Sequence, residues 1–272
     1  MNPYVELIRP NICFLAISGF IVGLLIAKLP PNLWIFPILA VFLITASGNV
    51  INDYFDFKID KINKPRRPLP SGKIPRKEAL VLYFVLGSVG LMISFLVSLN
   101  FFILALFNSI LVFLYSWRFK KTWLGNSVVS FLACSVFVAP VFILYGIKEL
   151  LASPVITLTI IAFFGNYGRE VLKDVEDVKG DKLNGAETLP IILGNIKALI
   201  LGKTIIFITS FLLFLPYILG FFSEIYLVFA VAIFLFSIFI LKIGDPKKLQ
   251  KMIKVLMFLV ILSFLISVFF SW

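Results

Sequence analysis

The chain has 272 residues, of which 61% are hydrophobic and 14% are charged. Because soluble domains are nearer half apolar, this composition excludes an ordinary soluble protein and indicates an integral membrane protein. Lysine and arginine outnumber aspartate and glutamate by 25 to 14, and there is no histidine. Histidine-based acid–base catalysis, histidine haem ligation and ordinary zinc sites are therefore excluded.

Long apolar runs follow one another along the whole chain, most of them long enough to cross a hydrocarbon core of ~30 Å. Such continuous runs predict helices, because the strands of a membrane barrel alternate apolar and polar residues. The sequence therefore predicts an all-α integral membrane protein with nine transmembrane helices, bundled as a single polytopic domain over residues 1–272. The runs are 12–29, 33–51, 79–99, 101–117, 123–145, 151–168, 198–218, 222–241 and 253–271.

Basic residues are divided unevenly between the two sides that these runs define. If the N-terminus is cytoplasmic, every lysine and arginine except Lys28 and Lys148 falls on the cytoplasmic side. The positive-inside rule then predicts a multi-pass cell-membrane protein with its C-terminus outside. It also puts the two longest polar interruptions, 52–78 and 169–197, in cytoplasmic loops. The net charge of +11 favours contact with anionic membrane lipids and gives no support for a nucleic-acid partner.

An acidic pattern occurs twice, each time at the end of an apolar run. Segments 53–63 and 174–184 both read D-x2-D-x3-D-K-[I/L]-N. Carboxylates are costly near a bilayer and are kept there mostly for function, so the repetition predicts two halves of one site and a parallel pseudo-repeat. On a helix they share one stripe, where they repel one another unless a cation such as Mg²⁺ lies among them. The stripe residues are Asn49, Asn52, Asp53, Asp56 and Asp60 in the first copy, and Glu170, Asp174, Asp177 and Asp181 in the second.

Basic segments accompany the acidic ones. Segment 64–73 contains three prolines and ends in a Ser-Gly turn, so it predicts a stiff cationic loop. Such a loop suits phosphate recognition, because arginine binds phosphate in a bidentate fashion and lysine acts as a point charge. Segment 115–121 ends the fourth run in a similar way. Membrane topology alone also explains these charges, and among them Arg67 and Lys121 are the preferred phosphate ligands.

Several of these segments resemble a known family. Segment 52–60 matches the NDxxDxxxD motif of the UbiA superfamily of intramembrane prenyltransferases, and segment 174–181 resembles its second motif, DxxDxxxD. The sequences RPLPSG at 67–72 and ELIRPN at 6–11 also resemble segments of that family. The resemblance covers nearly the whole chain. It implies nine helices around a central cavity, with Mg²⁺ joining both motifs to a prenyl diphosphate donor, and a lipidic prenyl acceptor.

The resemblance also implies roles for individual residues. The metal ligands are expected to be Asn52, Asp53, Asp56, Asp60, Asp174, Asp177 and Asp181. The catalytic set is expected to be Asp56, Asp60, Asp177, Asp181 and Arg67. Diphosphate and phosphate binding is expected from Arg9, Arg66, Arg67, Lys73, Tyr115, Arg118, Lys120, Lys121, Arg169 and Lys173. The chain departs from the family's Tyr-x3-Lys element, because Phe119 stands four residues after Tyr115.

Three functions remain open at this level. The N-terminal segment and the first acidic segment most resemble the archaeal branch, which transfers a geranylgeranyl group to the hydroxyl of geranylgeranylglyceryl phosphate in ether lipid biosynthesis. The alternative is an aromatic acceptor of the quinone, chlorophyll or haem O pathway. A cation-coupled transporter also uses intramembrane carboxylates, but its site is typically near the bilayer midplane rather than at helix ends beside basic loops.

Overall fold

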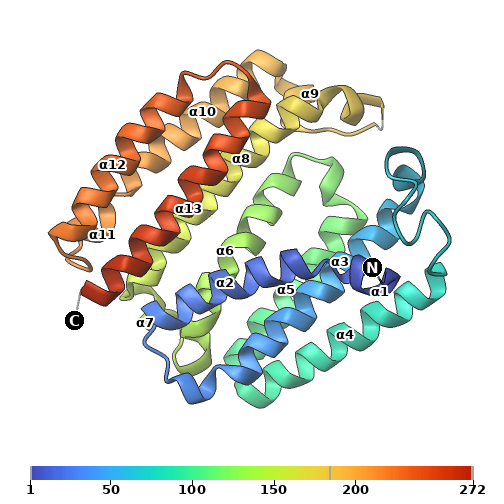
Figure 1. Ribbon diagram of the computed structural model, residues 1–272, viewed down its shortest axis with the longest axis horizontal. Helices are drawn as coiled ribbons and strands as arrows, with labels where there is room; N and C mark the ends of the chain where they lie inside the picture. The colour runs from blue at the N-terminus through green and yellow to red at the C-terminus, as the bar shows by residue number, and fades with distance from the viewer. Residues whose placement is uncertain (1, 184, 271–272) are drawn as a thin grey trace. The chain divides into compact units, whose positions relative to one another are not determined.

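The computed structural model describes residues 2–183 and 185–270, and helices make up most of this part of the chain (Figure 1). Asn184, which ends the second copy of the acidic pattern, and residue 271, which ends the last predicted run, lie outside the described residues. The chain divides into two compact units. The first unit comprises Met1–Arg118 and Ala139–Lys148, and the second comprises Phe119–Val138 and Glu149–Trp272. Each unit carries one of the two acidic motifs.

Helices of the first unit begin with a short α1 and continue through three long apolar helices. Their bounds are α1 Pro3–Ile8, α2 Pro10–Ile26, η1 Pro31–Leu33, α3 Ile35–Asn63, α4 Arg76–Val97 and α5 Leu99–Trp117. The remaining helices are η2 Phe119–Lys121, α6 Leu124–Leu144, α7 Ile147–Leu151, α8 Pro154–Leu183, α9 Leu189–Leu193, α10 Asn195–Leu212, α11 Leu215–Ile218, α12 Glu224–Leu241 and α13 Pro246–Phe270.

Among the described residues, eight helical segments are long and apolar enough to cross a membrane, and the 17-residue α2 is a shorter apolar helix. Each of the nine predicted runs coincides with one of these segments. The prediction of an all-α, multi-pass membrane protein is confirmed. Only the number of spanning helices differs among the described residues: nine were predicted and eight are long enough, because α2 is shorter than the others.

The prediction that segments 52–78 and 169–197 are loops is wrong in their first parts. Helix α3 continues to Asn63 and helix α8 to Leu183, so both acidic motifs are helical. The apolar runs end earlier because the following residues are polar, although the backbone stays helical. A backbone hydrogen bond from Lys64 N to the Asp60 carbonyl, 2.8 Å long, closes the last turn of α3.

In the first unit, a buried apolar cluster fixes the parts of the chain around the end of α3. Its members come from α1, α3, α4 and the loop between α3 and α4: Leu7, Val50, Leu69, Ile74 and Ala79. The loop contributes Leu69 and Ile74, each 2% exposed or less. Burial of two apolar side chains holds this loop against the helices, at about 1.5–3 kcal/mol for each large side chain.

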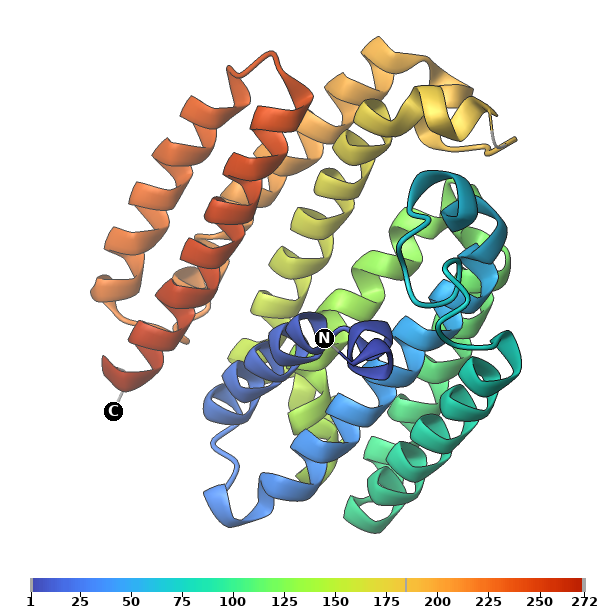
Figure 2. The ribbon, with the colours of Figure 1, turned by 45° about the vertical axis from the view of Figure 1, so that its right-hand side comes forward.

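In the second unit, α8 packs closely against α10, and α13 packs against α8 and α12 (Figures 1 and 2). Two glycines allow α8 and α10 to approach each other closely. A Cβ atom at Gly202 of α10 would lie 2.7 Å from Leu172 of α8, and one at Gly168 of α8 would lie 2.9 Å from Ile206 of α10. Small residues allow membrane helices to approach closely, so this pair fixes the part of α8 that precedes the acidic motif.

Candidate metal and phosphate site

The first acidic motif lies on the last three turns of α3. Asp53 and Asp60 are buried, each 4% exposed, whereas Asn52 and Asp56 are partly buried. The Asn52 Nδ2 atom donates to Asp56 Oδ2 at 3.3 Å. Residues three and four apart share a helix face, and the helical geometry therefore confirms the predicted stripe.

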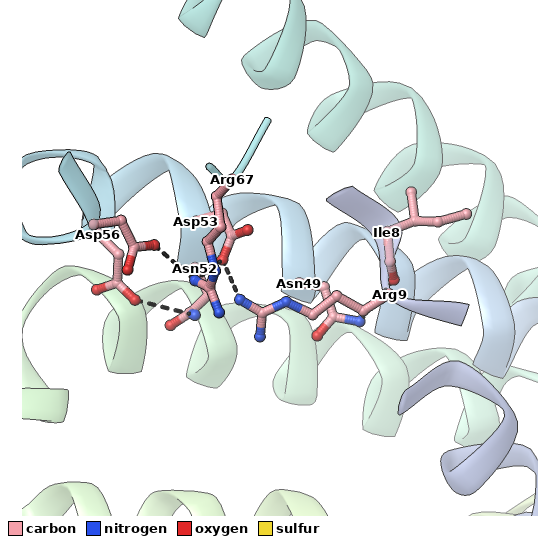
Figure 3. A network of polar contacts seen from close by, with 8 residues as sticks. Ile8, Arg9, Asn49, Asn52, Asp53, Asp56 and Arg67 are labelled. Atoms are coloured by element: carbon pink, nitrogen blue, oxygen red, sulfur yellow. Dashed lines mark hydrogen bonds and ion pairs between the residues drawn. The ribbon is translucent and has the colours of Figure 1, made fainter. Parts of the chain in front are cut away.

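Two arginines converge on this motif from outside α3 (Figure 3). Arg9 forms an ion pair with Asp53. Arg67 Nη1 lies 3.1 Å from Asp53 Oδ1 and 2.6 Å from Asp60 Oδ2. The arginine side chains are only 22% and 23% exposed, so these ion pairs are screened less than surface pairs. Arg9 and Arg67, which are both predicted phosphate ligands, are thus anchored on the acidic motif itself.

Arg9 is positioned by the junction between α1 and α2. It ends α1 and precedes α2 in the left-handed conformation, with φ 51° and ψ 71°. Proline at the start of α2 supplies the fixed φ that a helix start favours. The Asn49 Nδ2 atom donates to the Ile8 carbonyl at 2.9 Å, which ties the end of α1 to α3. Arg9 therefore reaches Asp53 because Asn49, on the same stripe, holds the preceding residue.

Arg76 is a basic residue that the sequence reasoning missed. It begins α4, and its guanidinium carbon lies 4.4 Å from the Tyr54 ring centroid and 4.9 Å from the Phe57 ring centroid. Both rings belong to α3, so the cation–π contacts join the start of α4 to the acidic motif. The signal was the pair of aromatic residues three apart within the motif.

The second acidic motif lies at the end of α8. Asp174 is buried, at 9% exposed, whereas Asp177 is exposed and Asp181 is partly buried. Asn126 of α6 donates through Nδ2 to Asp174 Oδ2 at 2.8 Å. Asn126 is itself 6% exposed and was also missed by the sequence reasoning, because nothing in the motif spacing points to α6.

Basic residues also converge within α8. Arg169 forms an ion pair with Glu170, and Lys173 Nζ lies 3.4 Å from Glu170 Oε2. Glu170 is 6% exposed. Both predicted phosphate ligands on α8 therefore meet at one buried carboxylate. Downstream, Gln250 of α13 donates to Glu176 Oε2 at 3.1 Å and so fixes the motif on its other side.

The carboxyl group of Asp181 lies in an environment that disfavours its charge. Burial raises the pKa of this carboxyl group above its usual value, and the neighbouring Asp177 raises it further. Lys173 and Lys120 act in the opposite direction but do not cancel the rise. A cation bound beside Asp181 would favour the ionised form.

The remaining predicted phosphate ligands lie in the loop between α3 and α4, at the end of α5 and on η2. Arg66 and Lys73 are exposed in the loop that holds Arg67, and Arg118 is exposed at the end of α5. Tyr115 is partly buried in the last turn of α5. Lys120 and Lys121 are exposed on η2, where the Lys121 carbonyl accepts a 2.7 Å hydrogen bond from Glu187 N. Within the predicted basic set, the ion pairs described above involve Arg9, Arg67, Arg169 and Lys173.

The donor set fits Mg²⁺ shared with a substrate better than Mg²⁺ held by protein alone. Among the described residues, no three acidic side chains are close enough to hold a metal ion by themselves. Mg²⁺ typically keeps several waters and binds one or two carboxylates together with substrate phosphates. The amide and carboxylate oxygens of Asn52, Asp56 and Asp177, on accessible or partly accessible side chains, suit that mode of binding.

These features define a polytopic helical membrane protein with duplicated acidic motifs, each accompanied by basic side chains suited to a phosphate-bearing ligand. Comparison with known families identifies the class: the UbiA prenyltransferase family matches residues 16–262. The chain belongs to this family and is a membrane prenyltransferase. The prediction from the two acidic motifs is confirmed, and the transporter alternative is not supported.

One relative and two solved structures give the range of similarity. Digeranylgeranylglyceryl phosphate synthase of Methanococcoides burtonii is 38% identical over 98% of this chain and 100% of its own length. A solved digeranylgeranylglyceryl phosphate synthase structure has a TM-score of 0.85 at 33% identity, covering 98% of this chain and 97% of its own. A UbiA homologue from Archaeoglobus fulgidus, solved with GPP and Mg²⁺, has a TM-score of 0.72 at 20% identity, covering 98% and 99%. Because its identity is only 20%, the A. fulgidus structure establishes a shared fold alone.

Proposed function

We propose that the protein transfers a geranylgeranyl group from geranylgeranyl diphosphate to the hydroxyl of geranylgeranylglyceryl phosphate, with Mg²⁺ as cofactor. The observation that carries this proposal is the 38% identity, over nearly the full length of both chains, to the enzyme of that name from Methanococcoides burtonii. The A. fulgidus homologue supports the cofactor and the donor class, because it was solved with both GPP and Mg²⁺.

The proposed metal ligands are the accessible oxygens of the two motifs. Asn52 and Asp56 lie together on α3, and Asp177 is exposed on α8. Asp181, which is partly accessible, would bind the ion directly, whereas Asp60, which is buried and paired with Arg67, would reach it only through the ion's waters. Bound Mg²⁺ would neutralise the charge that develops on the leaving diphosphate.

Arg67 would bind the donor's diphosphate. A guanidinium has five N–H donors in a planar fork, and the contacts of Arg67 with Asp53 and Asp60 both involve Nη1. The fork is therefore oriented by the protein while it offers further donors to a phosphate. Donors fixed before the reaction stabilise developing charge without reorganising, which favours departure of diphosphate.

The bond changes need no protein nucleophile. The bond between the allylic carbon and the diphosphate oxygen breaks, and its electron pair leaves with diphosphate. The hydroxyl oxygen of the acceptor forms the new ether bond to that carbon and releases its proton. The protein's own residues therefore act by binding and orienting two anionic head groups.

The phosphate of the acceptor requires cationic residues beyond those that hold the donor. We assign this role to members of the remaining basic set. A phosphate monoester gains charge-assisted hydrogen bonds from arginine and lysine without a metal ion. The set comprises Arg9, Arg66, Lys73, Arg118, Arg169 and Lys173. Tyr115, Lys120 and Lys121 stay proposed ligands of the diphosphate or the phosphate.

The orientation in the membrane is part of the same proposal. The N-terminus and the ends of α3 and α8 would face the cytoplasm and the C-terminus would lie outside, because nearly all basic residues then fall on the cytoplasmic side. Such an arrangement gives both acidic motifs access to a water-soluble head group from the cytoplasm.

An acceptor screen tests the proposed function. Purified protein would receive geranylgeranyl diphosphate, Mg²⁺ and one of three acceptors: geranylgeranylglyceryl phosphate, 4-hydroxybenzoate or a naphthoate. We expect prenylated product with the first acceptor alone. Product from an aromatic acid, with none from the glyceryl phosphate, would contradict the archaeal-lipid assignment and leave the prenyltransferase class intact.

A further inference from the structure

The first carboxylate of each acidic motif is held by donors from other parts of the chain. Asp53 accepts from Arg9 and Arg67, and Asp174 accepts from Asn126 of α6. Both carboxylates are buried, at 4% and 9% exposed. The same position of the repeated motif is thus protein-bound in both units, although the partners differ.

The middle carboxylate of each motif, three residues further on, is in a different environment. Asp56 is partly buried and contacts Asn52 on its own helix, and Asp177 is exposed. Mg²⁺ dehydrates reluctantly and keeps several waters, so it requires ligands that solvent and substrate can reach. A buried carboxylate whose charge is already matched by two guanidiniums gains less from a metal ion.

We propose that Asp53 and Asp174 are positioning residues, and that the metal ion is bound by the accessible residues of the two motifs. This assignment rests on the function proposed above and replaces the sequence-based expectation that both are metal ligands. Asp53 would hold the guanidinium of Arg67 in place for the donor's phosphates. Asp174 would hold α8 against α6 through Asn126, so that Asp177 faces its ligand in a fixed position.

The two partners make different demands on the carboxylate, and the difference can be tested. At position 174 an asparagine keeps a side-chain oxygen that can accept the hydrogen bond donated by Asn126 Nδ2, which needs an acceptor but not a charge. At position 53 an asparagine loses the negative charge that faces Arg9 and Arg67. Asp174→Asn should therefore be mild and Asp174→Ala harmful, whereas Asp53→Asn should disturb Arg67.

Metal binding without turnover is the first measurement. Mn²⁺ would be titrated into purified protein with inorganic diphosphate, and free Mn²⁺ would be read by electron paramagnetic resonance. We expect Asp56→Asn and Asp177→Asn each to weaken Mn²⁺ binding about tenfold or more, because each loses a charged oxygen ligand. Asp53→Asn and Asp174→Asn should change it by no more than about threefold, since neither supplies a ligand.

Substrate kinetics and thermal unfolding give the second readout. Asp53→Asn should raise the KM for geranylgeranyl diphosphate about tenfold at saturating Mg²⁺, because a displaced Arg67 binds phosphate less well. Asp174→Ala should lower the unfolding temperature, because the buried Asn126 amide loses its acceptor, and Asp174→Asn should restore most of the loss.

The outcomes separate this inference from the proposed function. The inference is overturned if Asp53→Asn or Asp174→Asn weakens Mn²⁺ binding as much as Asp56→Asn does, if Asp174→Asn behaves like Asp174→Ala, or if wild-type protein binds no Mn²⁺. If the four Asp→Asn variants show the expected Mn²⁺ pattern and the protein transfers no geranylgeranyl group, the proposed function fails and the assignment of the carboxylates stands.

Discussion

Individual residues in this protein are more closely partnered than their spacing in the sequence reveals. The motif spacing identified every carboxylate of the two stripes, because a period near four is readable in sequence. Their partners come from elsewhere: Arg9 from the junction of α1 and α2, and Asn126 from α6. The resemblance pointed to Arg9 through the segment ELIRPN, and two aromatic residues within the motif could have pointed to Arg76, whereas Asn126 had no signal. Tertiary contacts between distant segments have no local period to read.

The middle carboxylates should be needed for turnover. Replacing Asp56 or Asp177 with asparagine keeps the shape of the side chain and removes its charge. We expect the maximal rate to fall on the order of a hundredfold or more in each variant, because a charged oxygen near the leaving diphosphate is lost. The rate of diphosphate release measures this, with circular dichroism as the control for folding. Near-normal rates in either variant would rule out the two-motif mechanism.

Arg67 and its neighbour Arg66 form a matched pair for a second prediction. Both lie in the same loop, but Arg67 is anchored on Asp53 and Asp60 whereas Arg66 is exposed. Arg67→Ala should raise the KM for the donor and lower kcat, because its contact strengthens as charge moves onto the leaving group. Arg66→Ala should leave the donor KM within about twofold, since an exposed charge contributes little. Unchanged donor kinetics in Arg67→Ala would assign Arg67 to membrane topology alone.

At the scale of elements, the sequence predicted the position of each apolar helix and missed how far two of them continue. Helices α3 and α8 run well past the ends of their apolar runs, to Asn63 and Leu183. Hydropathy detects the part of a helix that lies in lipid. It does not detect a helical extension whose polar residues pair with other protein groups. Both acidic motifs lie on such extensions.

Packing of α8 against α10 should control the second motif. Gly202→Val would place a side chain where a Cβ atom alone comes within 2.7 Å of Leu172. Since Leu172 precedes Asp174 by two residues, we expect a loss of stability of about 1–3 kcal/mol from overpacking, accompanied by weaker activity. Gly165→Ala on α8 is the control, because a Cβ atom there meets nothing within 4 Å. Thermal unfolding in detergent measures both, and equal unfolding temperatures for the two variants would refute the close-packing argument.

At the scale of the whole molecule, the charge distribution predicts which side of the membrane each loop occupies. Replacing Lys73 or Lys148 with cysteine provides the test, because both side chains are exposed. The native Cys13 and Cys134 are buried and should not react. A membrane-impermeant thiol reagent should label Lys148→Cys in intact cells and Lys73→Cys only after permeabilisation. The reverse pattern would show that the N-terminus lies outside.

We propose that the protein joins two phosphate-bearing lipids through Mg²⁺-dependent loss of diphosphate. The most direct measurement is the stoichiometry of the reaction in one vessel, with purified protein, geranylgeranyl diphosphate and geranylgeranylglyceryl phosphate. Released diphosphate and the new ether lipid, quantified by mass spectrometry, should appear in equal amounts, and a metal chelator should abolish both. Diphosphate release without ether product, or product formation that survives the chelator, would contradict this reaction.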